Sequence, residues 1–334
     1  MTAADRVTAA DRVPGPAGHA SGGPDATEAR SGPVIAGVDI GGTATQVILC
    51  TPDFEIVGRA AAPTPRGGDA MIDVTLRMIG GLLAARGGEQ GGELLGVGIG
   101  AAGVVDAVAG NVLVASDTFH EWAGYEVTRT VTARTGVPAF LENDVNAFLT
   151  GEIAAGAIRG ERDALAIMLG TGVGGALWTD GRLFAGSHGA AGEIGHMPGF
   201  GDLVCSCGRH GHLETLAAGR QMELRYQEAG GERLSGVAIA ERAAAGEARA
   251  AAVFRTAGRA VGQAIAAASA LVDVTTVVIG GGVSRAWNLL APAMHEYLTD
   301  EPPVSGLPIR IEHSTLGKDA VAVGAASRVR AELG

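Results

Sequence analysis

The chain has 334 residues, enough for two domains, and 47% of them are hydrophobic while only 4% are aromatic. With a formal net charge of −11, the chain is a poor candidate for binding nucleic acid, whose phosphates are bound by clustered Lys and Arg. It contains no apolar run long enough to span a membrane, and its three cysteines give no disulfide framework. We therefore expect a soluble protein of the reducing cytoplasm, with no nucleic-acid or membrane partner.

The first 32 residues contain a direct repeat, TAADRV at 2–7 and 8–13, followed by a stretch rich in Gly, Pro, Ala and Ser. Such a segment cannot bury enough apolar surface to offset the entropy of ordering, so we expect a disordered tail at 1–32. A wrongly assigned start is the alternative. No apolar helical period occurs there that would suggest a DNA-binding helix-turn-helix.

Apolar runs and glycine turns predict the elements of the first half, beginning at Val34. The expected order is a three-stranded meander at 34–63, a helix at 71–87, a strand at 94–106, a helix at 126–136 and a strand that runs into a helix at 138–156. Gly136 is placed to close the helix that it ends.

The second half begins in the same way, with a strand, a glycine turn and a strand at 164–184. Beyond it we expect Ala-rich helices between about 217 and 271, a strand at 275–284, a helix near Trp287, a strand at 308–314 and a closing helix from Ala320. Because both halves begin with a strand, a glycine turn and a strand and go on with mixed helices and strands, we predict a duplicated α/β fold with a cleft between the halves.

Three glycine-rich turns each follow an apolar strand, at 39–43, 170–175 and 280–282. Backbone amides in such turns can converge on phosphate oxygens, and the missing Cβ atoms let the anion approach closely. Each turn taken alone could equally hold ordinary hairpin glycines. The sequence contains no G-x-x-x-x-G-K-[ST] motif, and none of the three turns gives G-x-G-x-x-G leading into a helix.

One short stretch, GEIGHMPGFGDLVCSCGRHGHLE at 192–214, gathers several side chains that bind metals. A Cys2His2 set for zinc is formed by His196, Cys205, Cys207 and His212. Their spacing differs from that of a zinc finger, but the glycines of the stretch allow a tight loop. The alternative is a reduced C-x-C in a surface loop with two incidental histidines. Two carboxylates, Glu193 and Glu214, bracket the set.

Seven segments together resemble the ROK family of bacterial sugar kinases and regulators. They are DIGGT at 39–43, GIGAAGVVD at 98–106, LENDVNA at 141–147, LGTGVGG at 169–175, GEIGH at 192–196, CSCGRHGHLE at 205–214 and IGGGVS at 279–284. The resemblance implies the actin-like ATPase (ribonuclease-H-like) fold, with two α/β domains and a cleft between them. We expect a small domain at 33–142, completed by a helix at 319–333, and a large domain at 143–318 that carries the zinc loop.

The resemblance also implies a reaction, the ATP-dependent phosphorylation of a hexose or amino hexose at its C6 hydroxyl. Asp144 matches the family's general base. An additional role is expected for Asp144 as the N-cap of the helix that follows it. The family's sugar-binding side chains match Asn143, Glu193, His196 and Glu214. His196 would then give one ring nitrogen to zinc and turn the other to the sugar, which makes the zinc structural.

Residues that the resemblance assigns to ATP and Mg2+ come from the glycine turns. Around the phosphates and their Mg2+ we expect Asp39, Gly41, Gly42, Thr43, Thr171 and Gly172, and against the adenosine half Gly281 and Gly282. A homodimer is expected from the resemblance alone, because these residues contain no interface signature. ATP and polyphosphate both stay open as the phosphoryl donor.

Two positions depart from the family pattern. His212 stands where the family usually has a cysteine, which leaves a sound Cys2His2 site. SDTFHEW at 116–122 replaces an Asn-containing segment of the glucokinases, and it offers Asp117, His120 and Glu121. An extra carboxylate such as Asp117 favours an amino sugar of the glucosamine or kanosamine type. Glucose, with a solvated acidic loop, is the alternative.

A sugar-sensing regulator of the same family is the alternative function. Such regulators carry a winged helix-turn-helix before the sugar domain, and residues 1–32 are too few and too irregular to form one. A sugar-binding module without activity is disfavoured by the intact Asp144 and DIGGT motif.

Overall fold

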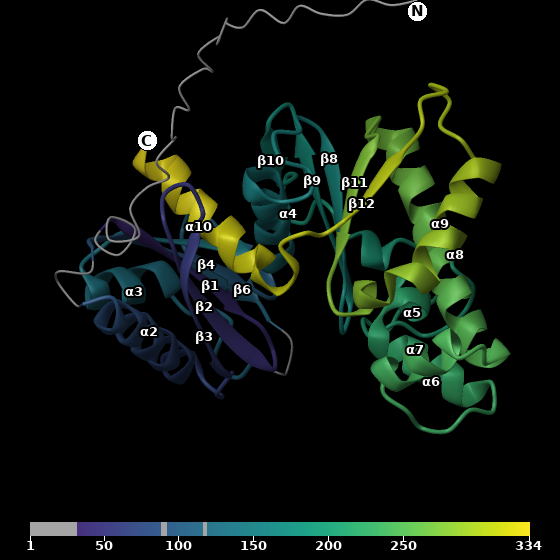
Figure 1. Ribbon diagram of the computed structural model, residues 1–334, viewed down its shortest axis with the longest axis horizontal. Helices are drawn as coiled ribbons and strands as arrows, with labels where there is room; N and C mark the ends of the chain where they lie inside the picture. The colour runs from purple at the N-terminus through teal and green to yellow at the C-terminus, as the bar shows by residue number, and fades with distance from the viewer. Residues whose placement is uncertain (1–31, 88–91, 116–118) are drawn as a thin grey trace, which may run out of the picture.

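A computed structural model describes residues 32–87, 92–115 and 119–334 of the protein (Figure 1). The tail expected at 1–32 lies outside these ranges except for Gly32, and Asp117 lies outside them as well. In the part of the chain that is described, no helix combines the length and the hydropathy needed to span a bilayer.

The first sheet contains five strands in the spatial order β3-β2-β1-β4-β7. They are β1 (Val34–Ile40), β2 (Ala44–Cys50), β3 (Ile56–Pro63), β4 (Leu94–Ala101) and β7 (Ala139–Asn143). β1, β2 and β3 form the expected antiparallel meander, while β4 runs parallel to β1 and β7 parallel to β4. Helices α2 (Gly68–Ala85) and α3 (Val127–Thr135) bury their apolar sides against one face of this sheet.

The second sheet repeats this arrangement in the order β10-β9-β8-β11-β12. Its strands are β8 (Ala164–Leu169), β9 (Val173–Thr179), β10 (Arg182–Phe184), β11 (Thr276–Gly280) and β12 (Arg310–His313). Again the first three strands, β8, β9 and β10, form an antiparallel meander, while β11 runs parallel to β8 and β12 parallel to β11. The duplication expected from the two similar openings is confirmed by this strand order.

A group of helices covers one face of the second sheet and shares its core. The group contains α5 (Glu214–Ala217), α6 (Gly219–Glu228), α7 (Gly236–Ala244), α8 (Ala248–Val272) and α9 (Trp287–Asp300). The expected Ala-rich helices are thereby confirmed, and the small side chains let α8 pack closely on α9. Short 3-10 turns also occur at η2 (Ile194–His196), η3 (Val283–Ala286) and η4 (Gly317–Asp319).

Two helices, α4 (Asp144–Ala155) and α10 (Ala320–Leu333), pack against each other between the sheets (Figure 1). α4 shares a core with the second sheet, and α10 covers the remaining face of the first. The crossing is close because Gly324 has no side chain, since a Cβ there would lie 1.6 Å from the Ala147 carbonyl oxygen. The domain boundaries at 142/143 and 318/319 stay a prediction.

The strand expected at 94–106 is two elements rather than one. β4 ends at Ala101, and β5 (Val104–Asp106) turns away to form a separate hairpin with β6 (Asn111–Val114). Gly103 makes the break, with φ of +107° and a position where a Cβ would lie 2.3 Å from the Val114 carbonyl oxygen. Apolar residues continue through the break, so hydrophobicity alone predicted a single strand.

Candidate active site

The turn between β7 and α4 carries the expected base. Asn143 is the N-cap of α4, since its Oδ1 accepts hydrogen bonds from the backbone N–H groups of Val145 (2.9 Å) and Asn146 (3.1 Å). Asp144 is the first residue of the helix. The expectation that Asp144 caps α4 is therefore wrong, because the extended backbone that a cap needs lies one residue earlier. In the first turn its carboxylate still benefits from the helix dipole.

The Asn143 side chain also uses its two amide hydrogens within the chain. Nδ2 donates to the Gly103 carbonyl oxygen at 2.9 Å and to Asp144 Oδ1 at 3.1 Å. Together with the two bonds at Oδ1, these contacts use the full hydrogen-bonding capacity of the amide. Asn143 thus orients Asp144, and a sugar hydroxyl would reach this amide only by replacing one of the four bonds.

Three carboxylates interact electrostatically around this turn: Asp39 at the end of β1, Asp144, and Glu193 before η2. Burial raises the pKa of Asp144 and the charge of Glu193 raises it further, although hydrogen bonds from Val145 and Asn143 oppose the shift. Burial, followed by the charge of Asp144, raises the pKa of Asp39 to about 7. A carboxyl group whose pKa lies closer to neutrality is a better proton acceptor near pH 7.

The four expected metal ligands come together. Their ligand atoms all lie within 4.8 Å of one another. His196 Nδ1 is 3.4 Å from His212 Nδ1 and 3.7 Å from Cys205 Sγ, and Cys207 Sγ is 3.3 Å from His212 Nδ1. With Zn–N of about 2.0 Å and Zn–S of about 2.3 Å, a tetrahedral ion would separate its ligands by roughly 3.3–3.8 Å. The donor set therefore fits zinc in its chemistry, and these three pairs fit it in their spacing.

The second ring nitrogen of His196 faces a different neighbour. Its Nε2 lies 3.9 Å from Glu193 Oε2, while Nδ1 faces the cluster. Both side chains are partly exposed, at 39% for His196 and 53% for Glu193. One imidazole therefore connects the metal cluster to an accessible carboxylate near Asp144.

Glu214 connects the same loop to the turn between β8 and β9. Its Oε2 accepts the backbone N–H of Val173 at 3.1 Å, and its Oε1 accepts the Ser206 hydroxyl. Gly172 is needed beside it, because a Cβ at that position would lie 2.6 Å from Oε2. Glu214 is only 8% exposed, and through these two hydrogen bonds it holds the Thr171–Gly172 turn against the predicted metal-binding loop at 192–214, called here the metal loop.

The two expected phosphate turns are at equivalent places, between β1 and β2 and between β8 and β9. Gly42, Thr43 and Thr171 are exposed, and Gly41 and Gly172 are half-buried. Gly41 is held by the Thr64 hydroxyl, which donates to its carbonyl oxygen at 2.7 Å. Both turns thus leave backbone groups accessible to a ligand at the ends of paired strands.

A pocket of about 870 Å³ begins at the β8–β9 turn and extends between α6, α7 and α9. Thr171 and Gly282 line it, whereas Gly281 is packed under the turn with φ of +89°. Sequence reasoning missed most of its walls, including Met222, Ile239, Phe254, Arg285 and Asn288. They belong to separate helices, so no local sequence pattern could have identified them.

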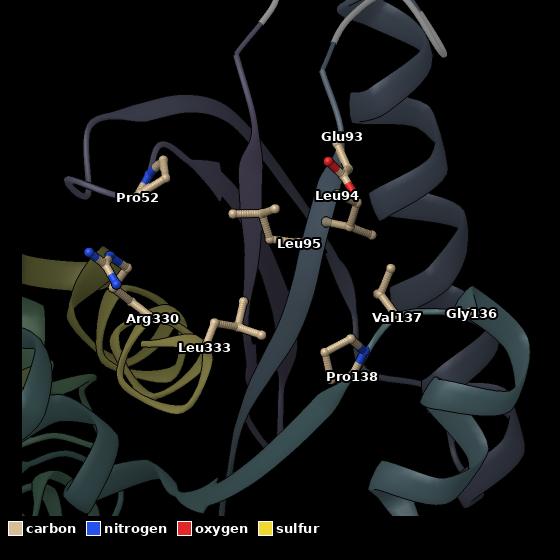
Figure 2. Close-up of a pocket in the computed structure, with 9 residues that line it drawn as sticks. All are labelled: Pro52, Glu93, Leu94, Leu95, Gly136, Val137, Pro138, Arg330 and Leu333. Atoms are coloured by element: carbon tan, nitrogen blue, oxygen red, sulfur yellow. The ribbon is translucent and has the colours of Figure 1, made fainter.

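A second pocket, of about 670 Å³, is lined by none of the predicted site residues. Figure 2 shows it between the end of α10, where Arg330 and Leu333 lie, and the chain leading into β4 and β7. These are the amino ends of the parallel strands, and Asp144 follows the carboxyl end of β7. The pocket in Figure 2 is therefore separate from the candidate active site.

The segment expected to select the sugar is described only from Phe119 onward. Asp117 lies outside the described residues, while His120 and Glu121 are exposed. Trp122 is fully buried and stacks on Tyr125 with ring centroids 5.4 Å apart. The aromatic pair anchors the end of this segment to the core of the first sheet.

The sequence model of the ROK family matches residues 35–332. The chain belongs to the ROK family. A glucokinase of Thermotoga maritima is 32% identical over 319 residues, which are 90% of this chain and 98% of the glucokinase. An N-acetyl-D-glucosamine kinase of Photobacterium profundum is 31% identical over 261 residues, 75% of this chain and 84% of that kinase.

A solved ROK structure supports the fold. The glucokinase of Streptomyces griseus in complex with glucose and AMPPNP superposes with a TM-score of 0.77 at 29% identity, over 89% of this chain and 99% of that one. With its two related mixed sheets, the chain has the actin-like ATPase fold that this resemblance implied. The residues that match the ROK family model, 35–332, include nearly all of both sheets and of the helices that cover them.

Proposed function

We propose that this ROK sugar kinase transfers the terminal phosphoryl group of ATP to the C6 hydroxyl of a hexose or amino hexose, with Asp144 as general base. The observation that carries the proposal is the environment of Asp144: Asn143 orients its carboxylate, its pKa is raised, and it lies close enough to Asp39 and Glu193 for their charges to repel. Asp39 precedes the glycine turn between β1 and β2, and Glu193 belongs to the metal loop, 3.9 Å from His196 Nε2.

Asp144 would act by accepting the proton of the attacking hydroxyl. Phosphoryl transfer needs an in-line acceptor and charge stabilisation around the transferring group. Asn143 Nδ2 donates to Asp144 Oδ1 and therefore restricts the rotation of the carboxylate. The oxygen that takes the proton is held in place before the sugar arrives.

The sugar would lie among Asn143, Glu193, His196 and Glu214, with Asp117 facing an amino group. Glu193 and His196 are exposed enough to meet a ligand directly. Asn143 would exchange one of its present bonds for a hydroxyl, and Glu214 would exchange Ser206. A site of this type rejects analogues that lack one hydroxyl, because a buried polar group is then left without a partner.

The nucleotide would run from the phosphate turns into the pocket of about 870 Å³. Gly41, Gly42, Thr43, Thr171 and Gly172 would surround the phosphates, and Gly281 and Gly282 would support the adenosine half. Asp39 is the hard oxygen ligand available for Mg2+, whose contribution when bound is to neutralise phosphate charge.

The metal site would be structural. His196, Cys205, Cys207 and His212 would fill all four positions around zinc and leave none open for a reacting atom. Zinc, when bound, would supply rigidity to the loop. His196 then presents its second nitrogen toward Glu193 in a fixed orientation.

A sugar-panel assay tests the proposed function. The enzyme is given ATP or polyphosphate with glucose, glucosamine, kanosamine or N-acetylglucosamine, and the phosphorylated position is identified by NMR. We expect ATP-dependent product at C6 and the highest kcat/KM for an amino sugar. A clear preference for glucose would reject the amino-sugar assignment, and no product with any sugar would reject the kinase assignment itself.

A further inference from the structure

Two residues before the proposed base is a buried carboxylate with no part in the chemistry above. Glu142 is only 7% exposed. Its Oε1 accepts the backbone N–H of Asn143 at 3.1 Å and Nδ2 of Asn146 at 3.0 Å. Since Asn143 in turn holds Asp144, the hydrogen bonds of Glu142 fix the turn that presents the base.

The other oxygen of Glu142 is paired with a residue that is remote in sequence. Arg328, on α10, donates from Nη1 to Glu142 Oε2 at 2.7 Å. The pair is largely shielded, with 26% of the Arg328 side chain and 9% of the Glu142 side chain exposed. A shielded carboxylate is costly without a cation, so removing the arginine leaves an uncompensated charge inside the turn.

Arg328 also contacts a third element. Its Nη2 donates at 3.3 Å to the carbonyl oxygen of Ala107, in the tight turn of the β5–β6 hairpin. Residue 103, whose carbonyl oxygen accepts from Asn143, immediately precedes β5. One guanidinium therefore ties α10, the β7–α4 turn and the β5–β6 hairpin together.

We propose that Arg328 is a positioning residue for phosphoryl transfer, acting through Glu142 and Asn143 to fix the orientation of the Asp144 carboxylate. Arg328 donates to Glu142, Glu142 accepts the backbone N–H of Asn143, and Asn143 donates to Asp144. The inference rests on the proposed function, because it assumes that Asp144 is the base.

A kinetic comparison with matched variants tests this role. Arg328→Met should lower kcat on the order of 10–100-fold, the effect of a misplaced reacting group, while the KM values for sugar and ATP change by less than about threefold. Arg328→Lys should recover part of the loss, because an ammonium pairs with Glu142 but cannot form the same fork to Ala107.

Two neighbours on α10 serve as controls. Arg330 is exposed, so Arg330→Met should leave kcat unchanged although it also removes an arginine. Val329 is fully buried in the core between α10 and the first sheet. Val329→Ala should lower Tm while keeping kcat, which separates loss of stability from loss of positioning.

A double-mutant cycle shows whether Arg328 acts through Glu142. Glu142→Gln keeps an acceptor for Asn143 and removes the charge, so adding Arg328→Met to it should lower kcat much less than in the wild type. Additive losses, an Arg328→Met kcat within twofold of wild type, or equal kcat losses in Arg328→Met and Val329→Ala would each overturn the proposal.

Wild-type turnover is measured first, so that failure of the proposed function can be told from failure of this inference. Absence of turnover with every sugar rejects both together. An active wild type with an unaffected Arg328→Met rejects the inference alone.

Discussion

The β7–α4 turn and the metal loop at 192–214 are built in opposite ways. The turn is held by a strand end, a helix start and an Asn143 amide that has no bonding capacity left. The loop has one short 3-10 turn before its two cysteines, and it passes through Gly199, Gly201, Gly208 and Gly211, all with positive φ. The proposed base is therefore positioned by the polypeptide itself, while the order of the proposed sugar-binding loop would depend on the metal that its four ligands bind.

The largest effect is expected from the turn. Asp144→Asn should lower kcat by roughly 100–10,000-fold, because an amide cannot accept the hydroxyl proton. Sugar binding, measured by calorimetry, should be nearly unchanged, since the turn that holds residue 144 does not depend on its charge. Turnover within tenfold of wild type would remove Asp144 from the role of base.

A smaller effect is expected from the metal loop, and it should appear in binding instead of turnover. Cys205→Ser should lose zinc by elemental analysis and raise the sugar KM on the order of 10–100-fold, as loss of support for a ligating histidine does. His210→Ala is the matched control, because His210 is exposed in the same loop and outside the cluster. Unchanged zinc content in Cys205→Ser would contradict the proposed site.

Asp39 tests what the half-buried carboxylates beside the turn do to stability. Its pKa is raised from 3.8 to about 7 in the folded chain, so folding favours the protonated form and stability falls as pH rises through that interval. Asp39→Asn should raise Tm by a few degrees at pH 8, with the gain disappearing toward pH 4. A Tm gain that does not depend on pH would show that ionisation of Asp39 does not destabilise the folded protein.

The smallest effect is expected at the contact between the loop and the β8–β9 turn. Ser206→Ala removes the hydroxyl that Glu214 Oε1 accepts, while Val173 N–H still holds Oε2. The sugar KM should fall by about 3–10-fold, the range for one hydrogen bond of typical net strength, because Glu214 no longer has to give up Ser206 when it meets the sugar, and zinc content should be retained. A loss of zinc in this variant would instead place Ser206 in the metal site.

The sequence predicted features that are local in the chain. Apolar runs ended by glycine identified both meanders, and the four Cys and His residues predicted as ligands proved to form one cluster. The prediction of Asp144 as the N-cap of α4 was wrong by one residue. Asn and Asp both cap helices well, and their order alone does not show which of the two has the extended backbone of a cap.

Features made by distant residues could not be predicted. Glu142 and Arg328 are 186 positions apart, and neither belongs to a motif that suggests a pair. The pocket of about 870 Å³ takes its walls from α6, α7, α8 and α9, whose order in the chain does not show which sides face each other. The break at Gly103 could not be predicted either, because the backbone of β6, which excludes a side chain there, is brought beside it only by the fold.

The cover that α10 gives to the first sheet has a consequence for biosynthesis. Ile35, Ile48 and Cys50 are fully buried beneath it, yet the ribosome makes them more than 250 residues before the helix begins at Ala320. The nascent first sheet must therefore carry an uncovered apolar face until the whole second sheet has been translated. That face is a natural binding surface for chaperones and the segment most exposed to aggregation when translation stalls.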